Sequence, residues 1–295
     1  MLFRSEADLP PGVFNLVTGP GPVVGDEIAA DPGTHAVGFI GSIATGRRVA
    51  ERAAGKELLL EMGGNGPLVV LEDADLDRAV DATLVACFLN AGQSCTAGER
   101  ILVQRAVHDE FLRQLTDAVA SRVRLGDPLD DATTMGPLNN PGVAAKTEEH
   151  VGDAVARGAH VLAGGTRAPR HGSDLFFEPT IVAGVTDDMA IARDETFGPV
   201  VPVTAIDHED EAIELVNGSP YGLLSAIFTA DLARGLRYAE AVRAGWVNVN
   251  EGTNYWESHL PFGGRAGSAS GVGRVGGRHA MERFTELKTI VVDLG

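Results

Sequence analysis

The sequence predicts an α/β protein built around parallel β-sheet. Three observations support this fold class. Short apolar runs typical of strands alternate with longer helical patterns along the 295 residues. With 44% hydrophobic residues the chain can bury a large core, and its 37 glycines are spread without a repeat, as in a protein with many tight turns. Repeated strand–helix units place helices on both faces of a parallel sheet.

The first block of the chain predicts a small strand–helix unit. We expect strands at 13–17, 36–40 and 57–61, and helices at 23–30 and 44–54. A parallel sheet of only three strands leaves an edge unpaired and a face uncovered. This block is therefore expected to pair with something else or to be part of a larger sheet.

A second block begins near Pro67. Strands are expected at 68–71, 100–104, 181–182, 200–206, 224–228 and 246–249, and helices at 76–90, 108–122, 143–157, 209–217 and 232–243. Asp75 is placed to cap the first of these helices. A glycine-rich loop at 263–277 and a last strand at 288–294 complete the prediction.

Charge and composition exclude several classes of function. The formal net charge of −17 opposes binding to nucleic acid and to anionic membranes. No uncharged apolar stretch reaches the ~18 residues of a membrane span. The two cysteines form no CxxC pair, and the histidines have no metal-ligand spacing, so no metal site is predicted. The first residues lack the pattern of a signal peptide, and a cytoplasmic protein is expected.

Cys95 is the candidate nucleophile. It follows a predicted helix in the small-residue segment 90–98, where backbone amides can approach a substrate oxygen. A thiol needs a lowered pKa or a nearby base to react, and a buried inert cysteine is the alternative. Cys87 lies inside an apolar helical stretch and is interpreted as a packing residue.

Glu61 is the candidate general base. It follows three leucines at the end of a strand, where burial would raise its pKa and prepare it for proton transfer. The alternative is an exposed acid at a strand end.

The segment 41–46 suits a phosphate group. Gly41, Ser42 and Gly46 connect a strand to a helix, and free amides converge at a helix N-terminus. An ordinary capped turn is the alternative. A GxGxxG pattern at Gly271, Gly273 and Gly276 is rejected as a nucleotide motif because no apolar strand precedes it. The loop 19–21 is the better second candidate.

Glu195 and Phe197 form a further candidate pair, in the segment 194–199. A carboxylate can bind ribose hydroxyls, and an aromatic ring can lie against a nicotinamide. The alternative is an ordinary surface loop.

Together these segments resemble the aldehyde dehydrogenase superfamily. The matching segments occur in the family's order over essentially the whole chain: 41–46, 61–64, 92–95, 195–199, 217–223 and 261–264. The resemblance implies an incomplete Rossmann-type cofactor domain at 1–64, an α/β catalytic domain at 65–264, and a C-terminal tail with an oligomerisation strand at 265–295.

The resemblance also implies the roles of the candidate residues. Cys95 attacks the aldehyde, hydride passes to NAD or NADP, and Glu61 activates water to release the acid from the thioester. Gly41, Ser42 and Gly46 lie at the pyrophosphate. Met62 contacts the carboxamide through its backbone, while Glu195 and Phe197 hold the nicotinamide riboside. Glu61 favours hydrolysis, because acylating relatives generally lack this glutamate.

Two departures from the family pattern matter. Asn65-Gly66 stands where a lysine is usual before Pro67, which we expect to be tolerated. The asparagine of the oxyanion hole and the lysine at the adenosine ribose, which family members carry further upstream, have no counterpart here. Losing one oxyanion donor costs ~10²–10³ in rate. We therefore expect this chain, taken alone, to be weakly active or inactive.

Two alternatives to a general aldehyde dehydrogenase stay open. One is a semialdehyde dehydrogenase of narrow specificity, with an aromatic wall from Tyr255 and Trp256. The other is a folded remnant or interaction module without turnover. The strand at 289–293 resembles the tail that family members lend to a neighbouring subunit, so a homodimer or tetramer is expected.

Overall fold

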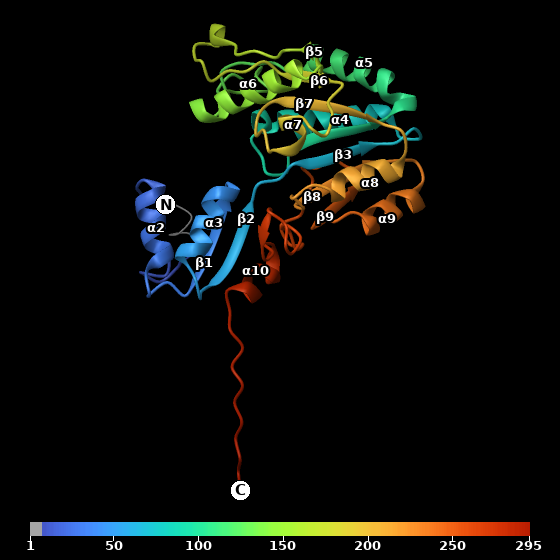
Figure 1. Ribbon diagram of the computed structural model, residues 1–295. Helices are drawn as coiled ribbons and strands as arrows, with labels where there is room; N and C mark the ends of the chain where they lie inside the picture. The colour runs from blue at the N-terminus through green and yellow to red at the C-terminus, as the bar shows by residue number, and fades with distance from the viewer. Residues whose placement is uncertain (1–7) are drawn as a thin grey trace.

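The structure, a computed structural model, describes residues 8–295. Within this range the strands form two sheets, joined where β2 passes into β3 (Figure 1). The strands are β1 (Ala36–Gly41), β2 (Glu57–Met62), β3 (Gly66–Val70), β4 (Gly98–Gln104), β5 (His160–Ala163), β6 (Thr180–Ala183), β7 (Val200–Ile206), β8 (Leu224–Phe228), β9 (Trp246–Val249) and β10 (Gly271–Val272). The helices are α2 (Gly21–Ala30), α3 (Ile43–Arg52), α4 (Leu76–Phe88), η1 (Leu89–Gly92), α5 (Arg105–Arg122), α6 (Pro141–Ala156), η2 (Pro169–His171), α7 (Ala190–Arg193), α8 (Glu209–Asn217), α9 (Leu232–Ala241) and α10 (Gly277–Arg283).

The larger sheet has seven strands in the order β5-β6-β7-β4-β3-β8-β9. All neighbours run parallel except β5, which is antiparallel to β6. Helices α4, α5 and α6 cover one face, where Phe111 and Leu115 pack on Ile101. Helices α8 and α9 cover the other face, where Tyr238 packs on Val69. This sheet is enclosed on both faces, which explains why its central strands β3 and β4 are buried along their whole length and are mostly apolar.

The smaller sheet has three strands in the order β1-β2-β10. Strands β1 and β2 are parallel, and β10 runs antiparallel to β2. One buried cluster of this sheet consists of Ala29, Val37 and Ala53, and Leu59 and Leu60 of β2 are buried as well. In the described part of the chain β1 has a strand on one side only, as the open edge predicted from the sequence requires.

Most predicted elements are confirmed, with ends that shift by a few residues. Asp75 caps α4 as expected, because its side chain accepts a hydrogen bond from the amide of Arg78. The helix expected at 108–122 begins earlier, at Arg105. Five elements were not predicted: β5, η2, α7, β10 and α10.

Two predicted strands are wrong. Residues 13–17 and 288–294 are irregular backbone without a ladder. Their apolar side chains are exposed, as for Phe14 at 53% and Val291 at 87%. An apolar run becomes a strand only where a neighbouring strand accepts its hydrogen bonds, and the described residues supply none for these two segments.

The stretch 265–295 divides into two parts. Strand β10 pairs with β2, and the side chain of Arg283 at the end of α10 donates to the carbonyl of Leu58 on β2 (2.7 Å). The last residues then project away from the body of the molecule (Figure 1). No helix among the described residues is long and apolar enough to cross a membrane.

Candidate active site

Cys95 lies in a loop shaped by left-handed backbone. Helix α4 ends at Phe88, and Asn90, Ala91 and Gly92 all have positive φ angles, of 53°, 55° and 73°. Such angles strain residues with a Cβ, so the turn needs support. The side chains of Asn90 and Gln93 supply it by donating to each other's backbone carbonyl groups (3.0 and 2.9 Å).

The thiol of Cys95 is half-buried against an apolar cluster that contains Leu223, Trp246 and Phe262. Burial, followed by the charges of Glu195 and Glu61, raises the pKa of this thiol to about 11. The thiol is therefore protonated at neutral pH in this state and needs a base or a change of surroundings to react.

Cys87 contrasts with Cys95. It is fully buried and donates a hydrogen bond to the carbonyl of Gly98 (3.0 Å), and burial raises its pKa further. This supports its interpretation as a packing residue.

The predicted site segments meet at the end of β2, which we call the junction. Its four consecutive residues 61–64 each approach a different one of these segments. A Cβ built on Gly64 would lie 2.2 Å from the carbonyl oxygen of Cys95, and one on Gly63 would lie 2.7 Å from the carboxylate of Glu195. Backbone and side chains approach too closely there for any larger residue. Met62 touches Gly46, where a Cβ would lie 2.2 Å from its sulfur, and its amide donates to Ser270.

Glu61 is buried, with 4% of its surface exposed. Neither carboxyl oxygen has a hydrogen-bond partner among the described residues. Gly263 makes room for it, since a Cβ there would lie 2.6 Å from Oε1. Burial raises the pKa of Glu61 to about 8, although the Arg274 cation lowers it somewhat. A carboxyl group in this condition can accept a proton near neutral pH.

Glu195 and Phe197 lie in the turn between α7 and β7. Oε1 of Glu195 accepts the amide hydrogen of Gly64 (2.9 Å), and its own amide donates to the hydroxyl of Tyr221 (3.1 Å). Burial raises the pKa of Glu195, while the Gly64 amide and Lys146 oppose this shift. Phe197 has a φ of 57°, in the left-handed region.

Ser42 caps α3. Its Oγ accepts from the amide of Thr45 (3.3 Å), and the turn follows directly from β1. A cavity of about 570 Å³ lies beside this turn, between α2, β1 and α3, and includes Pro22, Val37 and Thr45 in its lining. The loop 19–21 opens α2 and borders the same cavity.

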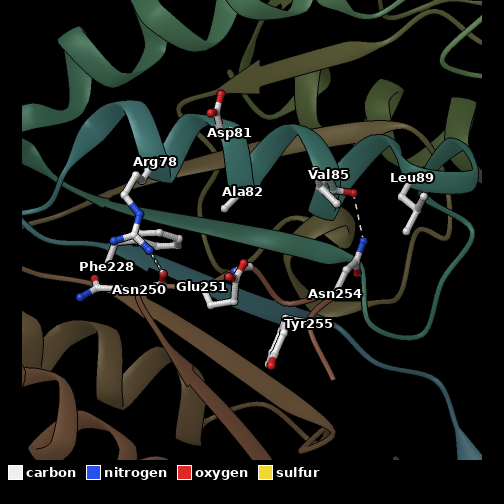
Figure 2. A pocket seen from close by; sticks show the side chains of 11 residues that line it. Arg78, Asp81, Ala82, Val85, Leu89, Phe228, Asn250, Glu251, Asn254 and Tyr255 are labelled. Atoms are coloured by element: carbon white, nitrogen blue, oxygen red, sulfur yellow. Dashed lines mark hydrogen bonds between the residues drawn. The ribbon is translucent and has the colours of Figure 1, made fainter. Parts of the chain in front are cut away.

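A second cavity, of about 460 Å³, lies along α4 (Figure 2). Its walls are the outer side of α4 and the segment 250–255. Asn254 connects this cavity to the nucleophile loop, because its amide nitrogen donates to the carbonyl of Val85 (3.0 Å) and its Oδ1 accepts from Thr96 (2.9 Å). Arg78 lies at the other end and donates to the carbonyl of Asn250 (2.8 Å).

The structure thus brings Cys95, Glu61, Met62 and Glu195 together around one strand end. Gly46 joins the same junction through Met62, with Gly41 and Ser42 directly before α3. The sequence reasoning missed four neighbours: Glu99, Lys146, Asn254 and Arg274. Each is a single polar residue without a local motif. Among residues 8–295 no cluster of three or more His, Cys, Asp or Glu side chains could hold a metal ion.

The rejected GxGxxG segment packs against other backbone. A Cβ on Gly271 would lie 1.8 Å from the carbonyl oxygen of Leu60, and one on Gly276 would lie 1.9 Å from that of Leu260. These glycines therefore allow close backbone contact within the small sheet and the loop beside it.

Residues 2–290 match the model of the "Aldehyde dehydrogenase family". This chain belongs to the aldehyde dehydrogenase family. It is 40% identical to the succinate-semialdehyde dehydrogenase [NADP(+)] GabD of Escherichia coli K12, over 98% of this chain and 59% of that protein. It is 42% identical to a betaine aldehyde dehydrogenase of Rhizobium etli, again over 98% and 59% of the two chains.

Solved structures agree with this assignment. An NAD-dependent aldehyde dehydrogenase from Sinorhizobium meliloti superposes with a TM-score of 0.95 and 38% identity, over 100% of this chain and 58% of that one. The α/β fold of the aldehyde dehydrogenases is thereby confirmed. The chain spans about three fifths of the length of the relatives it matches.

Proposed function

We propose that this chain carries the covalent chemistry of an NAD(P)-dependent, non-acylating aldehyde dehydrogenase, with Cys95 as nucleophile and Glu61 as general base. One observation carries the proposal. Glu61 is buried and has no hydrogen-bond partner within residues 8–295, and its charge is close enough to Cys95 to raise the pKa of the thiol. A poised base beside a thiol is what a thioester-forming hydrolytic site requires.

The reaction divides between these two residues. The sulfur of Cys95 adds to the carbonyl carbon, and the oxygen takes a proton, which gives a thiohemiacetal. A bound nicotinamide would supply the acceptor for the hydride of this carbon, the hydroxyl proton passes to solvent, and Cys95 is left as a thioester. Glu61 removes a proton from water, the water oxygen bonds to the acyl carbon, and the C–S bond breaks. The products are a carboxylic acid and the restored thiol.

The described residues fit a dinucleotide. The cavity between α2 and α3 can take an adenosine, and the N-terminus of α3 at Ser42 can take the pyrophosphate. Glu195 and Phe197 would hold the nicotinamide riboside, and Met62 would contact the carboxamide through its backbone. Gly41 and Gly46 leave room at this turn, since a Cβ at either would clash with Phe39 or Met62.

For the substrate we propose an uncharged or cationic aldehyde. Phe262 belongs to the apolar cluster against which Cys95 packs, and the ring centroids of Trp246 and Trp256 lie 6.0 and 5.8 Å from that of Phe262. Aromatic faces attract cations and apolar groups. Arg78 is the cation in the lining of the cavity along α4, and it lies at the end away from Asn254 (Figure 2). This arrangement favours the substrate type of the betaine aldehyde relatives over a succinate semialdehyde.

The narrow semialdehyde alternative makes the opposite prediction. Aldehyde-dependent reduction of NAD(P) should be measured with betaine aldehyde and with succinate semialdehyde at equal concentrations. A higher kcat/KM for the anionic aldehyde would contradict our substrate proposal. Substitution Cys95→Ala must abolish turnover of either substrate, and Cys87→Ala serves as the matched thiol control.

We also propose that the 295 residues alone turn over weakly or not at all. Among residues 8–295, β1 has a neighbouring strand on one side only, and Ile40 on β1 is 73% exposed. A normal rate, near ~10 s⁻¹, would contradict this proposal. Thiol labelling separates an incomplete enzyme from a remnant without function, because only an intact site makes Cys95 react much faster than Cys87.

For the assembly we propose a homodimer or tetramer in which the tail after α10 pairs with a neighbouring subunit. Ile290 and Val292 in this tail are 75% and 70% exposed. Light scattering on the full chain and on a chain ending at residue 285 tests this proposal. An unchanged mass would contradict the assignment of the tail as an assembly strand.

A further inference from the structure

Glu99 is a buried carboxylate that the proposed mechanism does not use. It lies on β4, four residues after Cys95, and is 4% exposed. Its Oε2 accepts the amide hydrogen of Thr196, and its Oε1 accepts that of Phe197, both at 2.7 Å. A buried charge without such partners would strongly destabilise the fold, so this arrangement needs an explanation.

The turn that Glu99 contacts has three successive backbone N–H donors. The amides of Glu195, Thr196 and Phe197 follow one another, and each donates to a side-chain oxygen, from Tyr221 or Glu99. Successive amides beside a left-handed residue form a concave site that attracts an anion. Here the carboxyl group of Glu99 supplies the acceptor oxygens. Burial and the charge of Glu195 raise the pKa of this carboxyl, and the hydrogen bonds from the amides of Phe197 and Thr196 oppose that rise.

The contact also offsets strain at Phe197. A left-handed φ is unfavourable for a residue with a Cβ. Two hydrogen bonds to a carboxylate belong to the stronger class and can hold this conformation. The hydroxyl of Thr196 contacts the ring Nδ1 of His150 on α6 (3.0 Å), so the other side of the turn is fixed as well.

The same turn meets the nucleophile loop at a second point. A Cβ on Gly92 would lie 2.1 Å from the carbonyl oxygen of Gly198, so these two backbones are in direct contact. Gly92 precedes Cys95 and Glu99 follows it. The cofactor turn is therefore attached to the nucleophile segment on both sides of the cysteine.

We propose that Glu99 is a positioning residue. By accepting hydrogen bonds from the backbone amides of the turn that carries Glu195 and Phe197, it holds this turn against the Cys95 loop. The inference rests on the proposed function, because it gives this turn a role at the cofactor. Glu99 acts through the backbone and touches no reacting atom. It ensures that the thiol and the nicotinamide riboside site keep one relative placement.

Hydrogen exchange of the full chain tests the proposal without any cofactor. In Glu99→Gln the amide group can accept at one oxygen only, and its NH₂ faces the second backbone donor. We expect the amides of Thr196 and Phe197 to exchange at least about tenfold faster. Alkylation of Cys95 should accelerate as well, because the loop loses one of its two attachments.

The matched control is Glu209→Gln. Glu209 accepts from Arg234 (2.9 Å), and this pair joins α8 to α9. We expect this variant to leave exchange at Thr196 and Phe197 and alkylation of Cys95 unchanged. Equal acceleration in both variants, or none in Glu99→Gln, would overturn the proposal.

A shorter carboxylate covers the case in which Glu99→Gln does not fold. Glu99→Asp keeps the charge but reaches only one of the two amides, so we expect a smaller acceleration at the same two residues. Wild-type exchange there would also overturn the proposal. Failure of the proposed function has a different signature: an aldehyde would not slow alkylation of Cys95 in the wild-type protein, while the exchange comparison still gives its answer.

Discussion

The two sheets of this chain differ in how completely they are enclosed. The seven-stranded sheet has helices on both faces and a core of large buried side chains, among them Phe111, Leu115 and Tyr238. The three-stranded sheet has a core of small residues, and its β1 edge is open. Cys95 lies just before β4 of the enclosed sheet, while Ser42 directly follows β1 of the open sheet. The nucleophile is therefore held by this chain's own core, whereas the cofactor side has little internal support.

The largest expected effect is loss of core packing in the enclosed sheet. Phe111 is a fully buried residue of α5, so Phe111→Ala should destabilise the protein by ~3–5 kcal/mol through lost burial and a cavity. Val37→Ala in the small sheet should cost ~1 kcal/mol or less, since Val37 is 9% exposed and has few large neighbours. Urea denaturation followed by circular dichroism measures both. Similar losses would contradict the contrast between the sheets.

The junction between the sheets should tolerate no side chain. Gly64→Ala places a Cβ against the carbonyl of Cys95, and backbone cannot move aside cheaply, so we expect a loss of ~1–3 kcal/mol. The matched control is Gly152→Ala inside α6, where a Cβ meets nothing within 4 Å. That change should stabilise the helix by ~0.5–1 kcal/mol. A neutral Gly64→Ala would show that the junction is looser than the structure indicates.

The sequence predicted the motifs that meet at this junction, but not the contacts that hold them together. The segments at 61–64, 92–95 and 195–199 were each visible as local patterns, and the structure brings them together. Glu99 was missed because it is a single acid without a local motif. The backbone amides that donate to it lie almost a hundred residues later in the chain. The strand predicted at 13–17 failed for a related reason: apolar content is local, but the hydrogen-bonding partner of a strand is not.

The pH dependence of stability should carry the signature of Glu61. Its pKa is raised from 4.5 to about 8 in the folded chain, so the folded state holds a proton that the unfolded state releases. Stability should therefore fall as pH rises from about 4.5 to 8, and stay at the lower value above this window. Glu61→Gln removes that loss and should therefore gain a few kcal/mol relative to wild type at pH 9 compared with pH 4. Parallel stability curves for the two proteins would exclude a buried, protonated Glu61.

The smallest effect is expected at the open edge itself. Ile40 on β1 is 73% exposed, so Ile40→Lys removes little burial and should change stability by no more than ~0.5 kcal/mol. A lysine on an unpaired edge strand opposes pairing with another chain. Self-association measured by light scattering should therefore decrease while the unfolding curve hardly moves. If stability falls by several kcal/mol instead, Ile40 is covered in solution and the β1 edge is not open, which would remove the structural reason to expect weak turnover from the chain alone.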